Sequence, residues 1–577
     1  MPQVSLTDFN VVLAVLGAFM TLYGVISVKI KQKWYLGEAL PAMLVGICLG
    51  PVAAKFLDSE RWGQGQVGQT KDIALGLMRV VIGVQLVIAG YQLPAKYNAT
   101  RWKEMAICLI PVMTLMWLCT TGCIMATIPR LTFLGALVIA SCVTCTDPIL
   151  SQAIAKGPFA DKYVPRHLRE IISSEAGAND GLGFPFLMLA TYIMRHCFGT
   201  TDYSHDGSSG GEAARNGAEA AHRLLARSAD VGRLGGGVGE AMKQWFVECW
   251  VYYIVLGVAY GATVGYVSCR SIKFALRKGW IDEQSYLLFP VAIGLFIIGT
   301  CGAMGTNDLL ACFVAGNLLN WDGNFLAETY QRHDEVNHCL DVLLNFGGFM
   351  FVGTVLPWSE FHDPDGTGVT IPRLIGLGFM VLAFRRIPAI LLVYKFMPKV
   401  CHDIKEALFM GYFGPIGVGA VFYREHMRHL FPHGDAADQE EKDVLDLAGP
   451  VVYWLVFFSI IWHGLSIPAL NLIYQWRGVE PILDDAVSIR RKSFTMATPA
   501  NAITGDEDNF IAFNRFSRPD PNSRANSMVL SGELSPAAQH ARNEFAIFSG
   551  THSEEDSERE REEAEKRRRR RTIQYDV

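Results

Sequence analysis

Long apolar runs limit what this chain can fold into. Between about residue 11 and residue 475, apolar side chains fall into runs of roughly 17 to 25 residues, the length that a helix needs to cross a hydrocarbon core about 30 Å thick. Half of the residues are hydrophobic, and the mean hydropathy is +0.22. This pattern predicts an all-α polytopic membrane protein and excludes water-soluble domains of ordinary composition.

Thirteen candidate membrane spans can be read from the sequence. They cover approximately residues 11–28, 36–53, 72–93, 104–125, 131–155, 170–195, 245–267, 284–301, 306–320, 339–356, 372–396, 404–423 and 447–472. The short loops after odd-numbered spans are rich in lysine and arginine, so the positive-inside rule predicts that they are cytoplasmic. The N-terminus would then lie outside and the C-terminus inside.

Two polar segments divide the chain. Residues 196–243 are rich in glycine and alanine, so we predict a flexible insert between a first half, residues 1–195, and a second half, residues 244–475. The halves are offset by seven spans, an odd number, so matching helices would run in opposite directions as two inverted repeats. Residues 476–577 form a polar tail that is predicted to be largely disordered and cytoplasmic.

The fifth and twelfth spans contain helix-breaking residues at matching places in the two halves. The fifth contains Asp147-Pro148, and the twelfth contains the run GPIGVG from Gly414 to Gly419. Proline removes a helical hydrogen bond and glycine weakens a helix, and exposed backbone at this depth is tolerated only inside protein or beside water. We therefore predict two crossed discontinuous helices at a transport site. Two kinked helices without a function are the alternative.

Few charged side chains are expected near the centre of the bilayer, and each is a candidate functional residue because charge at that depth is costly. They are Arg79, Asp147, Glu175, Asp180, Asp308, Arg385 and Arg386, with Asp341 nearer a span end. Asp180, Asn179, Asp147 and Thr146 together offer an all-oxygen site that suits a small alkali cation. Without histidine or cysteine in this cluster, a zinc site fits poorly.

Asp180 is the predicted carrier residue. Burial favours the protonated form of a carboxyl, so a proton and a metal cation can compete for it. Either ligand neutralises the site, and only a neutral site crosses cheaply between inward-facing and outward-facing states. A carboxylate that merely pairs with an arginine is the alternative.

Two further groups of charged residues have structural interpretations. Glu175 precedes Asp180 by five residues, about 500° around a helix, so the two side chains point in different directions. Arg385 or Arg386 is the expected partner of Glu175, and the sequence does not decide between them. Asp308, after Asn307 at the start of the ninth span, either acts as a helix N-terminal anion or lines the cation path.

These motifs resemble those of the monovalent cation/proton antiporters, most closely the fungal plasma-membrane sodium/proton antiporters. They are CTDPIL in the fifth span, SEAGANDG with FPF in the sixth, GTNDLLACFVAGN in the ninth, RRIP in the eleventh and GPIGVGA in the twelfth. The resemblance covers roughly residues 10–475. It implies a homodimer, a thirteen-helix inverted-repeat fold, and an elevator-like motion of a six-helix core that carries the ion.

The same resemblance implies a set of roles. Sodium and lithium, with potassium as a further candidate, would be exported as protons enter, and no cofactor is required. Asp180 and Asp147 match the cation-binding acids, and Thr146 and Asn179 would assist them. The chain departs from the family pattern at Ala176, where many relatives carry serine, and at Asn307, where fungal members often have a second acid.

Two other functions compete with exchange. A cation channel needs a continuous pore and usually symmetric filter loops, which the sequence does not display. An intramembrane aspartyl protease could use Asp147 and Asp180 as a dyad, but neither lies in a GxGD-type context. The net charge of −5 gives no support for nucleic-acid binding, so membrane lipid is the expected surrounding. In the tail, Ser493 and Ser527 each follow an arginine by three residues and are candidate kinase sites.

Overall fold

The computed structural model describes residues 8–57, 69–148, 150–151, 154, 157–197, 236–331, 336–432, 437–482, 486–490, 502–504 and 509–513. The chain forms two compact units, Met1–Pro481 and Ile482–Val577, and each is described by itself. The centre of the predicted insert and both candidate kinase sites, Ser493 and Ser527, lie outside the described residues.

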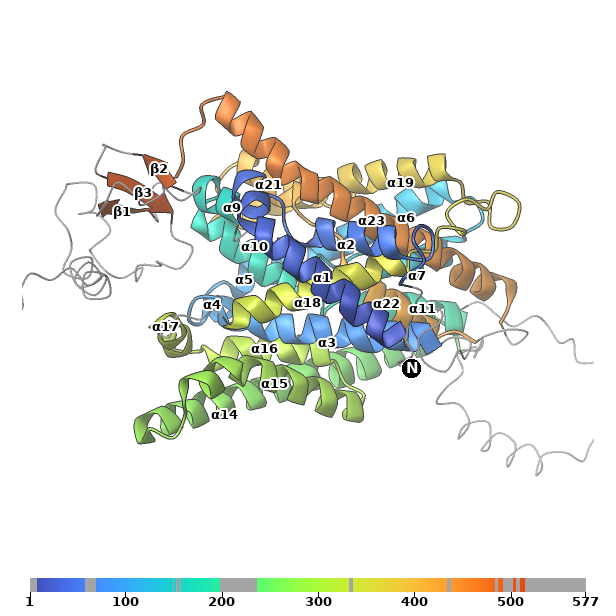
Figure 1. The fold of residues 1–577 in the computed structure, drawn as a ribbon. Helices are drawn as coiled ribbons and strands as arrows, with labels where there is room; N and C mark the ends of the chain where they lie inside the picture. The colour runs from blue at the N-terminus through green and yellow to red at the C-terminus, as the bar shows by residue number, and fades with distance from the viewer. Residues whose placement is uncertain are drawn as a thin grey trace, which may run out of the picture. The chain divides into compact units, whose positions relative to one another are not determined.

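The described part of the first unit is helical (Figure 1). Up to the insert its helices are α1 (Asp8–Val28), the π-helix η1 (Lys29–Lys33), α2 (Ala39–Leu49), α3 (Gln69–Tyr91), α4 (Tyr97–Thr100), α5 (Trp102–Ile107), the π-helix η3 (Cys108–Val112), α6 (Met113–Thr127), α7 (Phe133–Cys142), α9 (Pro158–Tyr163), α10 (Arg166–Asn179) and α11 (Phe184–Cys197). Pro111 lies inside η3, where its missing amide hydrogen accounts for the widened turn.

The remaining helices of this unit follow the insert. They are α13 (Gly237–Gln244), the π-helix η4 (Trp245–Val255), α14 (Leu256–Lys278), α15 (Glu283–Met304), α16 (Asp308–Leu319), α17 (Asn324–Gln331), α18 (Val336–Thr354), α19 (Ile371–Phe384), α20 (Ile387–Val393), the short 3-10 helix η5 (Tyr394–Phe396), α21 (Ile404–Tyr412), α22 (Val418–Arg428) and α23 (Gln439–Trp476). Helix α13 begins inside the predicted insert and continues through η4 into α14.

Helices coincide with each of the thirteen predicted spans, which confirms the predicted fold class of this unit. Seven helical stretches in the described chain are long and apolar enough to cross a membrane, and shorter apolar helices include α2, α7 and α16. The chain is therefore a multi-pass membrane protein.

Four spans are interrupted. The fifth breaks between the end of α7 at Cys142 and Pro148, and the twelfth breaks between Tyr412 and Val418, as the sequence predicts. The sixth and eleventh spans are also interrupted, which the sequence analysis did not predict. Each of these two restarts with proline as the second helical residue, Pro185 in α11 and Pro388 in α20, where the missing amide hydrogen costs little.

Two of the helix pairs that cross at very short range do so through facing glycines. Helix α2 packs against α18, and α3 packs against α16. An added Cβ at Gly46 of α2 would lie 2.1 Å from a carbonyl oxygen of α18, and one at Gly353 of α18 would lie 2.3 Å from a carbonyl oxygen of α2. Gly90 of α3 and Gly316 of α16 face each other in the same way, with carbonyl oxygens at 2.6 and 2.3 Å. Both crossings therefore depend on glycine.

The second unit contains three short strands within its described residues. They are β1 (Ala486–Arg490), β2 (Ala502–Thr504) and β3 (Asn509–Phe513), which form an antiparallel sheet in the order β1-β3-β2. Ile511 in the central strand lies opposite Ser488 of β1 and Ile503 of β2. These strands lie in the tail for which the sequence predicts little regular structure.

Candidate functional site

Asp147 joins the two interrupted spans that cross here. Its backbone N–H donates to the carbonyl of Pro415 in the twelfth span, at 2.9 Å. Its Oδ2 accepts the N–H of Val418, the first residue of α22, at 2.6 Å. Its Oδ1 accepts the N–H of Leu150 in its own span, at 2.9 Å. One carboxylate thus caps two helical segments at their N-terminal ends, where partial positive charge favours an anion.

Asp180 lies at the end of α10 and is fully buried, with 0% of its surface exposed. Neither of its carboxylate oxygens has a hydrogen-bond donor among the described residues. An added Cβ at Gly419 would lie 2.8 Å from its Oδ1, so the twelfth span passes directly against this carboxylate. The hydroxyl of Tyr423 donates to the backbone carbonyl of Asp180 and holds the chain in place.

Thr146 and Asn179 hold the fifth and sixth spans together. The amide of Asn179 donates to the Thr146 hydroxyl oxygen at 2.7 Å, and its Oδ1 accepts the Thr146 N–H at 3.1 Å. Because each residue directly precedes an acid, this pair brings the backbones of Asp147 and Asp180 to the same place. Gly417 and Gly419 of the twelfth span, two residues apart, lie against the carboxylates of Asp147 and Asp180 respectively. The four predicted site residues therefore form one cluster.

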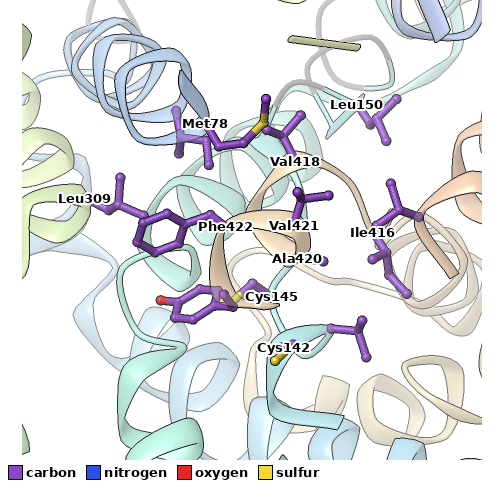
Figure 2. Close-up of a cluster of buried hydrophobic side chains, with 14 of the residues drawn as sticks. Met78, Cys142, Cys145, Leu150, Leu309, Ile416, Val418, Ala420, Val421 and Phe422 are labelled. Atoms are coloured by element: carbon purple, nitrogen blue, oxygen red, sulfur yellow. The ribbon is translucent and has the colours of Figure 1, made fainter. Parts of the chain in front are cut away.

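Buried apolar side chains gather on the same interrupted spans (Figure 2). Five of the residues labelled there come from the twelfth span, three from the fifth, and one each from α3 and α16. They are Ile416, Val418, Ala420, Val421 and Phe422, then Cys142, Cys145 and Leu150, and finally Met78 and Leu309, all of them buried. In such surroundings an unpaired charge is strongly disfavoured.

Arg385 supports the interruptions through carbonyl groups. Its guanidinium donates to the carbonyl oxygens of Gly414, Thr144 and Cys145, at 2.7, 2.9 and 2.7 Å respectively. The carbonyls of Thr144 and Cys145 lie in the non-helical part of the fifth span, so they require donors from elsewhere. Arg385 therefore stabilises both broken helices without a carboxylate partner among these contacts.

Arg386 is the partner of Glu175. Its two terminal nitrogens donate to Oε1 and Oε2 of Glu175 at 2.6 and 2.7 Å. The pair is fully enclosed, with side-chain exposures of 4% for Arg386 and 1% for Glu175. The Nε of Arg386 also donates to the carbonyl of Met410 in α21. The pair thus ties α10 to α21, in the interior of the bundle.

Asp308 forms an ion pair with Arg79 of α3. Its other oxygen accepts the N–H of Leu309 in the first turn of α16. Asn307 caps this helix by accepting the N–H of Leu310, and its amide donates to the carbonyl of Gly181, next to Asp180. Asn307 therefore links α16 to the turn that follows the candidate carrier residue.

Two contributors to the site were missed by sequence reasoning. Ser459 and His463 lie one turn apart on α23, in an otherwise apolar stretch. The Ser459 hydroxyl accepts the N–H of Ile416, at 2.8 Å, and His463 Nε2 lies 3.1 Å from the carbonyl of Tyr412. Both side chains thus satisfy backbone groups that the break in the twelfth span leaves free. Their i, i+4 spacing in an apolar run was the available signal.

A buried charged cluster at the end of α22 was also missed. Glu425, 1% exposed, accepts from Arg424, from Arg428 at 3.3 Å and from the Tyr453 hydroxyl at 3.1 Å. The predicted twelfth span ends at residue 423, whereas α22 continues to Arg428. These charges therefore lie beyond the predicted span and were not among the candidate functional residues.

The model of the family described as "Sodium/hydrogen exchanger, transmembrane" matches residues 15–472. A "Probable Na(+)/H(+) antiporter" of Schizosaccharomyces pombe is 35% identical over 477 residues, which make up 81% of this chain and 56% of that protein. A Na(+)/H(+) antiporter of Saccharomyces cerevisiae is 32% identical over 482 residues, 82% of this chain and 44% of that protein. The chain thus spans about half the length of these relatives.

A solved structure has a similar fold. The sodium proton antiporter of Methanocaldococcus jannaschii superposes with a TM-score of 0.51 at 13% sequence identity, covering 79% of this chain and 100% of that one. At this identity the likeness concerns the arrangement of the helices alone.

Proposed function

Because this chain belongs to the sodium/hydrogen exchanger family, we propose that it exchanges sodium ions for protons across a membrane. Members of this family are transporters rather than enzymes and need no cofactor, since cations and protons are the transported substrates. The proposal for this chain assigns the exchange to Asp180 and Asp147 at the crossing of the interrupted spans.

One observation carries the proposal. The Asp180 carboxylate is fully buried and has no hydrogen-bond donor among the described residues. Around it the other buried acids have partners, with Glu175 bonded to Arg386, Asp308 to Arg79, and Asp147 to two backbone amides. A bare buried carboxylate is costly unless a proton or a cation neutralises it. Asp180 thus has the property that competition between the two requires.

Alternating access follows from this competition. Once neutralised by a proton or a cation, the site moves between inward-facing and outward-facing states, whereas the bare site does not. Thr146 and Asn179 act in this scheme by holding the two aspartates together. The interruption near Asp147 leaves backbone groups without the hydrogen bonds that a continuous helix would give them, so they are free to bond to other parts of the bundle.

An inverted repeat is part of the proposal. In such a repeat the second span corresponds to the ninth and the third to the tenth. The packed pair α2 and α18, which are the second and tenth spans, then corresponds to the packed pair α16 and α3, which are the ninth and third. Both pairs pack closely, and both do so through facing glycines. The fifth and twelfth spans, which also correspond, cross each other at their interruptions. This symmetry supports two structurally related halves of opposite orientation.

Several finer features extend the proposal. Lithium and potassium are candidate substrates beside sodium, and a plasma-membrane location is expected from the resemblance to the fungal plasma-membrane antiporters. The N-terminus is assigned to the outside and the tail to the cytoplasm from the distribution of basic residues. A homodimer with an elevator-like moving core is expected from the resemblance, and cross-linking in native membranes would test it.

The test is proton/cation exchange by the full chain in proteoliposomes, with sodium, lithium and potassium each added against an imposed pH gradient. Asp180→Asn should abolish exchange while the protein still elutes as a folded species. Asp365→Asn, at an exposed loop acid, is the matched control and should retain exchange. Exchange that survives Asp180→Asn would refute Asp180 as the carrier.

The same vesicles discriminate the competing functions. A channel would pass cations without coupled proton movement and at a far higher turnover, so sodium flux that leaves the pH gradient intact would contradict exchange. Cleavage of a model transmembrane peptide without any exchange would favour the aspartyl protease.

A further inference from the structure

A second cluster of chemically active side chains lies outside the site described above. His167 is the second residue of α10, His402 lies just before α21, and Glu406 lies in the first turn of α21. One ligand atom from each of these three side chains lies within 4.8 Å of the other two. The exchange mechanism uses none of them.

The geometry of this cluster is convergent. His167 Nε2 lies 3.0 Å from Glu406 Oε1, and His402 Nδ1 lies 3.6 Å from Glu406 Oε2. The two imidazole rings are adjacent, with centroids 4.2 Å apart. Two imidazoles therefore share one carboxylate, although a simple ion pair would need only one of them.

We propose that His167, His402 and Glu406 bind a divalent transition-metal ion, with Zn²⁺ as the best match. Two imidazole nitrogens and one carboxylate oxygen are a ligand set that zinc accepts in proteins. Bond lengths of about 2.0–2.2 Å place tetrahedral ligand atoms roughly 3.3–3.6 Å from one another. The two histidine–Glu406 separations of 3.0 and 3.6 Å are near this range, and all three ligand atoms already lie within 4.8 Å of one another.

Exposure and supporting contacts fit the same assignment. The His402 side chain is 54% exposed, which leaves room for water as a fourth ligand and gives the ion an entry path. Glu406 is held in place, because its Oε2 accepts the backbone N–H of His402 at 2.6 Å. Its own N–H donates to Asp403, the N-cap of α21, at 2.7 Å. Such contacts orient a ligand before the metal arrives.

Metal binding would clamp two helices that lead into the cation site. Helix α10 carries Glu175, Asn179 and Asp180, and α21 leads into the interruption that contacts Asp147. A bridge between their N-terminal ends adds to the Glu175–Arg386 pair, which joins the same two helices. The assignment does not depend on the proposed exchange function.

The test is metal binding by the full chain, purified without a histidine tag. Cys48 and Cys339, which are exposed, are first replaced by serine so that these two thiols cannot bind the probe. Co²⁺ is titrated while its visible absorption is followed, and Zn²⁺ is then added in competition. One ion per chain is expected, and Zn²⁺ should raise the unfolding temperature.

Three variants decide the outcome. His167→Ala, His402→Ala and Glu406→Gln should each weaken Co²⁺ and Zn²⁺ binding at least about tenfold, because loss even of supporting residues costs 10–100-fold. His429→Ala removes an exposed histidine on another helix end and should leave the affinity unchanged. Glu406 also helps to order the start of α21, so the exposed His402 is the decisive position. Binding of equal affinity in the His402→Ala chain, or no stoichiometric binding to the parent chain, would overturn the proposal.

Discussion

Arg386 forms a two-point ion pair with Glu175, in which Nη1 meets Oε1 at 2.6 Å and Nη2 meets Oε2 at 2.7 Å. Arg385, its neighbour in sequence, instead donates to three backbone carbonyls. The two side chains diverge because the eleventh span is interrupted between α19 and α20 at these residues. The two consecutive arginines thus stabilise different features. Arg386 forms an ion pair between helices, and Arg385 stabilises the two interruptions.

The ion pair leads to the first prediction. Glu175→Gln leaves a buried guanidinium without its counter-charge, which should lower the free energy of unfolding by about 3–5 kcal/mol. The measurement is thermal unfolding of the purified chain in detergent. The double variant Glu175→Gln with Arg386→Met should recover part of this loss, since it removes both charges. A double variant that is less stable than the single one would contradict this account.

The sequence predicts the features that depend on local chemistry. Pro148 lacks an amide hydrogen in any fold, so the break beside Asp147 follows from residue type alone. Which of Arg385 and Arg386 pairs with Glu175 does not follow from residue type. It depends on the direction of each side chain after an interruption in the eleventh span. Pro388 accompanies that interruption, but the partners of Arg385 are carbonyls in other spans, so its direction depends on tertiary packing.

Ser459 and His463 were omitted for a different reason from the charged cluster of α22, which lies beyond the predicted end of the twelfth span. Ser459 and His463 carry no charge that would mark them in an apolar run, and only their contacts with the interrupted twelfth span reveal a role. Likewise, the sequence identified Asp180 as a buried acid, but the lack of a donor for it is a property of the assembled bundle.

Ser459 provides the second prediction. Ser459→Ala would leave the buried N–H of Ile416 without its acceptor, at a cost of about 1–3 kcal/mol. We expect lower thermal stability and slower exchange, because the backbone beside Asp147 loses its support. Ser459→Thr keeps the hydroxyl and should restore most of both. Ser27→Ala, on an exposed turn of α1, is the control and should change neither.

Two glycines of the twelfth span provide the third prediction. A Cβ at residue 417 would lie 2.1 Å from Asp147 Oδ2, and one at residue 419 would lie 2.8 Å from Asp180 Oδ1. Gly417→Ala should therefore displace Asp147, cost about 1–3 kcal/mol or more, and abolish exchange. Gly419→Ala needs a smaller shift and should reduce exchange with a changed apparent sodium affinity.

A helical glycine without close neighbours serves as the comparison. Gly299 in α15 has no heavy atom within 4 Å of an added Cβ, so Gly299→Ala should be neutral or stabilise the helix by up to about 1 kcal/mol. Exchange by the Gly417→Ala chain at the rate of this control would show that the close approach to Asp147 is not required.

The fourth prediction concerns pH and a loop outside the membrane spans. The backbone N–H groups of Gly366 and Thr367 donate to Asp363, each at 2.9 Å, and these bonds hold the pKa of its carboxyl below its usual range. A pKa that is lower in the folded state means that the ionised form stabilises this loop. The contribution is present above the unfolded-state value of about 3.9 and is lost as the pH falls through the folded-state pKa.

Asp363→Asn should consequently lower the unfolding temperature slightly at neutral pH, and the difference from the parent chain should shrink on acidification. Unfolding followed at a series of pH values between neutrality and the acid range checks this. A difference that grows as the pH falls would have the wrong sign and would exclude this role for Asp363.

The ion pair of Arg79 with Asp308 allows a test of whether Asp308, beyond its place as an anion at the start of α16, lines the cation path. The Arg79 side chain is 32% exposed and that of Asp308 is 4% exposed, so the pair is only partly enclosed by the protein. Asp308→Asn, Arg79→Gln and the double variant form a thermodynamic cycle, for which we expect a coupling free energy of about 1 kcal/mol in thermal unfolding.

If Asp308 serves only this pair, the apparent sodium affinity of exchange stays unchanged in all three chains. If Asp308 lines the cation path, Asp308→Asn weakens that affinity and Arg79→Gln does not, whatever the stability. We expect the first pattern, because both Asp308 oxygens already accept hydrogen bonds at the start of α16.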